Sequence, residues 1–142
     1  MDINRISKVL KFCCKKYDNK TFSHCIRVAN YAIENPILYT EENKENIYIL
    51  AMSHDLLEDT DTTYEELVNV SGMSEEFLRS QLGVLTKNKN ESYIDYIKRL
   101  KESGYRWAYI VKLADMKDHL MQKETLTDKL KEKYWEALPE LL

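Results

Sequence analysis

Glycine, proline and cysteine are scarce in this 142-residue chain, which has three, two and three of them respectively. So few glycines and prolines leave little of the turn chemistry that β-hairpins need, and the composition therefore favours an all-α fold. An odd number of cysteines without a Cys-x-x-Cys pair argues against a disulfide framework or a cysteine zinc site. We therefore expect Cys13, Cys14 and Cys25 to be buried, reduced thiols.

Long apolar runs and a large excess of one charge are also missing. No run approaches the ~20 residues of a membrane span, and the first residues lack the basic and apolar regions of a signal peptide. These absences predict a cytoplasmic protein with no membrane partner. The net charge of −3 gives no reason to expect a nucleic acid partner. The sequence does not indicate an oligomeric state.

Apolar residues recur at three- and four-residue spacing along most of the chain, as in amphipathic helices. Thr63 with Glu66 forms a capping box that starts one helix, and Gly104 is suited to end another. The pattern predicts a single domain over residues 1–142, a bundle of about seven to eight helices with its core at about 17–122 and a C-terminal helix packed on it. The predicted helices cover residues 3–16, 22–34, 43–58, 63–70, 75–83, 92–102, 105–121 and 125–141.

One predicted helix ends in a run of chemically active side chains. His54 and Glu58 are four residues apart and share a helix face, whereas Asp55 and Asp59 form a parallel row about 100° round. The last turn of a helix disfavours anions, so this crowding calls for a nearby cation. A solvated acidic helix end is the alternative for Glu58, Asp59 and Asp61.

A second segment, Ile110 to Asp115, places one carboxylate inside an apolar helical run. A buried aspartate is costly unless it is paired or bound to a metal ion, and Lys112 is a candidate partner for a plain salt bridge. Two imidazoles and two carboxylates from three helices would make a mixed nitrogen and oxygen site. Such a site suits Mn²⁺, Fe²⁺, Co²⁺, Ni²⁺ or Mg²⁺ better than a closed tetrahedral zinc site.

These residues resemble the H…HD…D pattern of the HD-domain metal-dependent phosphohydrolases, and "HCIRVANYA" (24–32) is similar to a helix of that family. "HDLLEDTDTT" (54–63) and "VKLAD" (111–115) are similar to the hydrolase domain of the RelA/SpoT alarmone enzymes and their small single-domain relatives. Those enzymes remove the 3′-pyrophosphate from guanosine tetra- and pentaphosphate. The resemblance implies an HD-domain fold and a nucleotide as the small-molecule substrate.

The resemblance also implies a role for each matching residue. It assigns a divalent ion, most often Mn²⁺, to His24, His54, Asp55 and Asp115, and it matches Glu58 and Asp59 to the pair that activates the attacking water. Lys112, His119 and Tyr134 match positions near the substrate. For Tyr134 the alternative is core packing beside Trp135 and Leu138, and for His119 it is a surface position.

The chain departs from the family pattern in two places. The family's basic segment with Gly and Pro before the first histidine is "KKYDNKTFSH" here, without either residue. The family's KLADRxxN is "KLADMKDH" here, so Met116 and His119 replace its Arg and Asn. Selectivity for guanosine is therefore the least supported part of the resemblance.

Three hypotheses about function follow. The first is a ppGpp 3′-pyrophosphohydrolase, the second is an HD nucleotidase or phosphodiesterase acting on another nucleotide, and the third is a non-catalytic protein that binds a metal or nucleotide. The presence of both Glu58 and Asp59 argues against the third, because a pure binder has no need of a general base.

Overall fold

The computed structural model describes residues 3–37 and 40–142. Within these ranges the chain forms nine helices and no strand, so the all-α prediction is confirmed. One cluster of buried apolar side chains takes members from every helix. The helices are α1 (Ile3–Lys16), α2 (Asn19–Ile33), α3 (Glu41–Ser53), α4 (Leu56–Asp59), α5 (Tyr64–Ser71), α6 (Glu75–Leu85), α7 (Tyr93–Ser103), α8 (Arg106–Met121) and α9 (Asp128–Leu141).

The prediction of one continuous helix over residues 43–58 is wrong, because α3 ends at Ser53 and the one-turn helix α4 follows after two residues. The Ala51 carbonyl accepts hydrogen bonds from the backbone N–H of His54 at 3.4 Å and from its imidazole Nδ1 at 2.6 Å. That carbonyl would otherwise accept the N–H of residue 55 in an uninterrupted α-helix. The two bonds from His54 therefore replace the regular α-helical bond to this carbonyl. As a result α3 ends at Ser53, and α4 begins only at Leu56.

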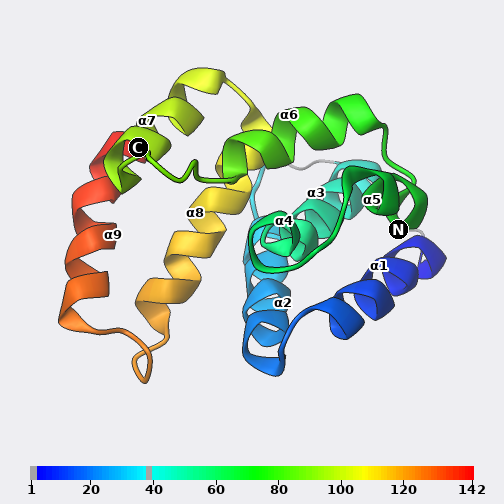
Figure 1. The fold of residues 1–142 in the computed structure, drawn as a ribbon, viewed down its shortest axis with the longest axis horizontal. Coiled ribbons are helices and arrows are strands. Elements are labelled where there is room, and N and C mark those ends of the chain that lie inside the picture. The colour runs from blue at the N-terminus through cyan, green and yellow to red at the C-terminus, as the bar shows by residue number, and fades with distance from the viewer. Residues whose placement is uncertain (1–2, 38–39) are drawn as a thin grey trace.

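Helix α2 packs against both α3 and α8, and α8 lies between α2 and α9 in Figure 1. The buried face of α2 is built from small side chains, with Val28, Ala29 and Ala32 each at most 1% exposed. Small residues allow neighbouring helices to approach closely and to pack without voids. This close packing brings the polar residues at one end of α2 next to the middle of α8.

The cysteines only partly follow the prediction. All three are free, and Cys13 and Cys25 are buried, but Cys14 is exposed. Cys13 lies on the core-facing stripe of α1 together with Val9, and the next residue points about 100° away from that stripe.

No helix in the described part of the chain is both long and apolar enough to span a lipid bilayer.

Candidate metal centre

The four residues predicted as metal ligands lie together, although they come from three separate parts of the chain. His24 is on α2, His54 and Asp55 form the turn between α3 and α4, and Asp115 is on α8. His24 Nε2 is 2.9 Å from Asp115 Oδ1 and 3.8 Å from Asp55 Oδ2. His54 Nε2 is 3.3 Å from Asp55 Oδ2 and 3.4 Å from Asp115 Oδ1. One imidazole nitrogen from each histidine therefore faces oxygens of both carboxylates.

The orientation of His54 is fixed by its own helix. Its Nδ1 donates to the Ala51 carbonyl, which leaves Nε2 as the nitrogen that faces the cluster. That Nε2 is buried and makes no hydrogen bond within the described part of the chain, even though two carboxylate oxygens lie within 3.4 Å of it. A buried polar atom without a partner is costly, and this one is aimed where a cation would satisfy it.

The orientation of His24 is fixed by a carboxylate from α8. His24 Nδ1 donates to Asp118 Oδ2 at 2.7 Å, and Asp118 in turn accepts from Arg27 Nε at 2.7 Å and Nη2 at 3.1 Å. A carboxylate behind the far nitrogen of a histidine is the usual arrangement around metal-binding imidazoles, because it fixes both the tautomer and the ring plane. Asp118 is only 1% exposed, so Arg27 also neutralises a buried charge.

The charges at the cluster shift the pKa values of its members strongly. Burial alone would raise the pKa of Asp115, but Lys112 and the three surrounding histidines hold it well below its ordinary value. Burial alone would lower the pKa of both His24 and His54, yet the neighbouring aspartates raise both values. The carboxylates thus favour positive charge beside the imidazole nitrogens. A divalent cation bound there would supply that charge in place of protons.

The donor set fits a divalent ion. Two imidazole nitrogens with two carboxylates form a mixed set that suits Mn²⁺, Fe²⁺, Co²⁺, Ni²⁺ or Mg²⁺, and the identity of the ion stays a prediction. Nitrogen and oxygen atoms of His24, His54 and Asp115 all lie within 4.8 Å of one another. The Cys25 thiol lies 3.9 Å from both His54 Nδ1 and Asp55 Oδ2 and lines the buried side of the cluster.

His119 and Tyr134 extend the cluster toward α9. His119 Nε2 is 3.3 Å from Asp115 Oδ1, and its ring stacks on Tyr134 with centroids 5.0 Å apart and planes 9° apart. Tyr134 belongs to the buried core and Leu138 packs against that core, so the core-packing alternative holds for Tyr134, although Trp135 itself is 56% exposed. His119 is not an isolated surface residue, because it joins the ligand cluster to the C-terminal helix.

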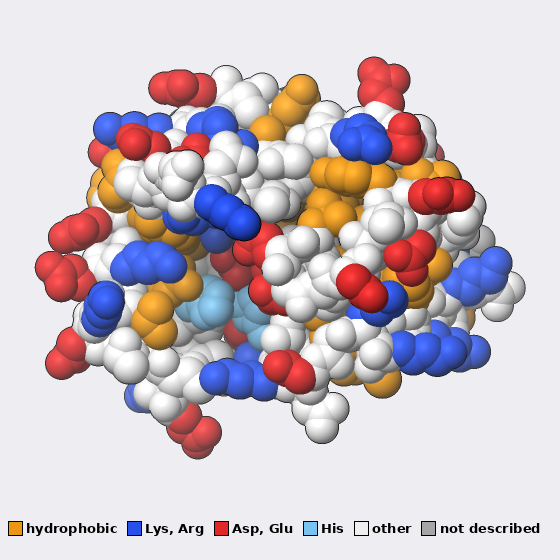
Figure 2. Space-filling model, viewed as in Figure 1, with side chains coloured by type: hydrophobic (Ala, Val, Ile, Leu, Met, Phe, Trp, Pro, Cys, Tyr) orange, Lys and Arg blue, Asp and Glu red, His pale blue; other side chains and the backbone are white. Residues whose placement is uncertain are grey.

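A cavity of ≈ 170 Å³ opens beside the cluster. Figure 2 looks into a hollow on this face, with histidine side chains on its floor, acidic side chains next to them and Lys or Arg around the edge. Glu58 lines the cavity, and its Oε1 accepts the backbone N–H of Lys87 at 2.8 Å. The other residues that line it are His54, Asp55, Leu85, Lys87, Tyr93, Tyr96, Lys112, Asp115, His119, Lys133 and Tyr134.

The structure separates the two acidic residues that the sequence pattern treats as a pair. Glu58 lines the cavity, but Asp59 is not among the described residues that form its wall. Partial burial, together with the carboxylates of Asp55 and Glu58, raises the pKa of Asp59.

Lys112 Nζ binds Asp115 Oδ2 at 2.7 Å. The plain salt bridge that the sequence offered as an alternative therefore exists, and it lies in the wall of the cavity.

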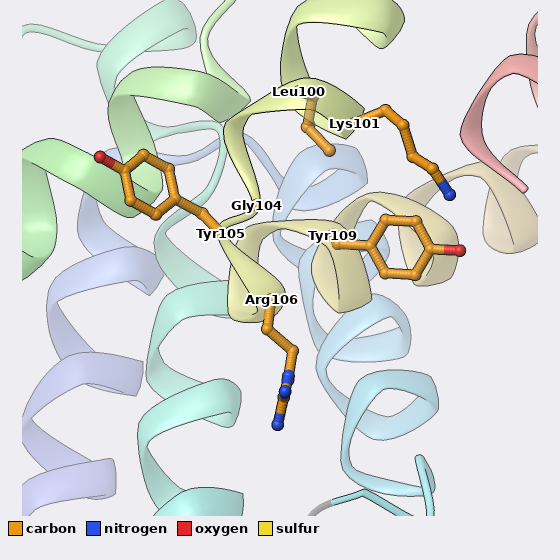
Figure 3. Close-up of a pocket in the computed structure, with 6 residues that line it drawn as sticks. All are labelled: Leu100, Lys101, Gly104, Tyr105, Arg106 and Tyr109. Atoms are coloured by element: carbon orange, nitrogen blue, oxygen red, sulfur yellow. The ribbon is translucent and has the colours of Figure 1, made fainter.

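A larger cavity of ≈ 320 Å³ lies elsewhere, at the corner between α7 and α8. In Figure 3 the side chains of Tyr105, Arg106 and Tyr109 point in three different directions rather than toward a common centre. Lys101 is engaged with the carbonyl oxygens of Leu141 and Leu142. This corner lacks converging polar groups, which distinguishes it from the cavity beside the histidines.

Sequence reasoning missed the residues that support the ligands from behind. Arg27 follows His24 by three residues and Asp118 follows Asp115 by three, so each stands on the same helix face as a predicted ligand. That spacing is the signal that could have found them. Lys133, next to the predicted Tyr134, was also missed, because its role depends on how α9 packs.

No protein-family model matches this chain, and no curated protein matches it. Function is therefore inferred from the site and from the resemblance of its motifs.

We expect Arg27→Met to lower the free energy of unfolding by about 2 kcal/mol, because it leaves the buried Asp118 carboxylate without its cation. This figure lies below the usual cost of breaking a buried pair, since the Arg27 side chain is 36% exposed. Denaturant unfolding of the metal-free protein measures the change. The matched control is Arg106→Met, which removes an exposed arginine of α8 and should change stability by less than about 0.5 kcal/mol. Equal effects of both variants would contradict the role given to Arg27.

Proposed function

We propose that this protein is a metal-dependent phosphohydrolase of the HD-domain type. The observation that carries the proposal is the convergence of His24, His54, Asp55 and Asp115, in which the buried Nε2 of His54 has no hydrogen bond to any described residue. The adjoining cavity carries lysine and tyrosine side chains, which suit an anionic phosphoryl group. Motifs that resemble those of the family lie at the same residues, so sequence and geometry support the same chemistry.

Each residue of the site has a part in this reaction. A bound divalent ion would act as a Lewis acid on a phosphoryl oxygen and would acidify water. Glu58 faces the cavity and is held by the Lys87 N–H, so it can accept a proton from an attacking water. Lys112 and Lys87 neutralise phosphate charge, and His119 can donate a hydrogen bond to the substrate. Asp59 is the less favoured base because its side chain lies outside the wall of the cavity.

We propose guanosine-3′,5′-bis(diphosphate) as the substrate, with loss of its 3′-pyrophosphate. Support comes from the joint resemblance of residues 54–63 and 111–115 to the alarmone hydrolase domain, and from the three lysines of the cavity, which suit a polyanion. The expected products are GDP and pyrophosphate.

A second candidate is hydrolysis of another nucleotide by the same site. The described residues that line the cavity include no Arg, Asn or Gln, side chains that can hydrogen-bond to two atoms of one base edge. Met116, which replaces the family's Arg, is buried in the core with 1% exposure. Both features favour weak selectivity for the base.

We expect one divalent ion per chain, and we expect His54→Ala and Asp115→Ala to abolish its binding, because each removes a ligand atom from the centre of the cluster. Elemental analysis of the purified, Mn²⁺-loaded proteins measures this. Asp61→Ala is the matched control, since it removes a carboxylate of the same segment that is 89% exposed. Full metal content in both ligand variants would refute the site.

We expect Glu58→Gln to keep the metal but to lower kcat by ~10²-fold or more, which is the scale of a lost general base. Asp59→Asn should have a much smaller effect, because its side chain lies outside the cavity wall. Turnover of ppGpp with Mn²⁺, followed by a pyrophosphate-release assay, compares the two. A reversed order of effects would assign the base to Asp59.

We expect hydrolysis of ppGpp with only weak preference over ppApp, because a site without fixed hydrogen bonds to a base edge cannot strongly reject an analogue. Side-by-side kcat/KM values for the two substrates decide the point. A guanine preference above ~10³ would show that the base is read by hydrogen bonds from other residues. Inactivity on both, with hydrolysis of a simple mononucleotide, would favour the second candidate.

A further inference from the structure

Lys133 is a cation of the cavity wall that has no carboxylate partner within 4.0 Å in the described part of the chain. It is partly buried on α9, and its ammonium is 4.3 Å from the ring centroid of Tyr93 and 5.3 Å from that of Tyr134. The two rings hold the ammonium in place through cation–π contact without neutralising it. Lys133 therefore presents a positioned charge to the cavity.

The surroundings of Lys133 make this charge costly for the empty protein. Burial lowers the pKa of Lys133, and the nearby ammonium groups of Lys112 and Lys87 lower it further. Lys112 is neutralised by Asp115, whereas the Lys87 ammonium donates to the Asn88 carbonyl. Lys133 and Lys87 thus both line one small cavity, and neither ammonium forms an ion pair with a described carboxylate, an arrangement that a bound anion would stabilise.

Tyr93 adds an independent observation. Its ring centroid is 4.3 Å from the ammonium of Lys133 and 5.4 Å from that of Lys112. Its hydroxyl group is buried, and it has no hydrogen-bond partner among the residues that the structure describes. This hydroxyl can donate to an oxygen of an anion, whose charge the ammonium of Lys133 would stabilise.

The volume of the cavity limits how much of an anionic ligand it can enclose. A volume of ≈ 170 Å³ is below the roughly 300–1,000 Å³ of pockets that enclose a drug-sized ligand. The cavity therefore suits the phosphoryl end of a substrate rather than a whole nucleotide. One phosphoryl group beside the histidine and aspartate cluster would leave Lys133 and Tyr93 to contact the group attached to it.

We propose that Lys133 and Tyr93 bind a second, directly linked phosphoryl group, and so select pyrophosphoryl compounds over monophosphates. This inference rests on the proposed function for the place of the first phosphoryl group. It adds two residues to the site, and it gives a reason why pyrophosphate rather than orthophosphate would be the product released with GDP.

The test measures binding, so it does not depend on turnover. Methylenediphosphonate and methylphosphonate are two non-hydrolysable probes that differ by one linked phosphoryl-like group, and calorimetry gives their Kd for the Mn²⁺-loaded and the EDTA-treated protein. We expect the native protein to bind the diphosphonate more tightly. Lys133→Met should weaken diphosphonate binding by about tenfold or more, the scale of one charge-assisted hydrogen bond, and leave monophosphonate binding nearly unchanged. Tyr93→Phe should act in the same direction with a smaller effect.

Two control variants keep the result interpretable. Lys133→Arg restores the charge and should recover most of the preference, which excludes a folding defect as the cause. Arg106→Met removes one positive charge from the other cavity (Figure 3), nine residues before Asp115 and so about 13 Å away along α8, and should leave both Kd values unchanged.

The inference is overturned if the native protein shows no preference for the diphosphonate, or if Lys133→Met weakens both probes equally. A protein that keeps the preference but hydrolyses no phosphoester would refute the proposed function and leave this inference standing. Hydrolysis of a pyrophosphoryl substrate with the same kinetics in Lys133→Met would refute the inference alone.

Discussion

The candidate site depends on one constraint, the close packing of α2 between α3 and α8. The small side chains of Val28, Ala29 and Ala32 allow that packing, and it brings an imidazole of α2 within 2.9 Å of a carboxylate of α8. Neither group would be stable there alone, because a buried charge needs a partner. The apolar packing of the helices therefore supplies the free energy that holds polar groups together.

The supporting contacts extend this arrangement in opposite directions. On one side, Arg27 and Asp118 fix the ring of His24, and the Ala51 carbonyl fixes the ring of His54. On the other side, His119 and Tyr134 connect the cluster to α9. Both histidines are thus held by bonds to their far nitrogens, which leaves the near nitrogens of the two rings in place before any ligand arrives. Such preorganisation reduces the cost of binding a cation.

The sequence was sufficient for the features that depend on local pattern. The all-α class, most helices and the four clustered residues follow from spacing and from motifs of a few residues. The break at His54 could not be predicted, because it arises from an imidazole that bonds to a carbonyl of its own chain rather than from a weak helix former. Lys133 could not be found either, since its position over Tyr93 exists only after α9 packs against α7. Glu58 and Asp59 are adjacent in sequence, and only the path of the chain after the break distinguishes them.

The break between α3 and α4 has a further consequence. Within α3, the buried residues from Ile47 to Ser53 hold the backbone firmly, whereas α4 is a single turn whose Glu58 and Asp59 are exposed. His54 belongs to the firm part and Glu58 to the short turn, with two residues between the helices. The imidazole is held by the Ala51 carbonyl of α3, whereas the Glu58 carboxylate is held by the backbone N–H of Lys87, beyond the end of α6. The two groups thus have separate supports, so a substitution that displaces one of them need not displace the other.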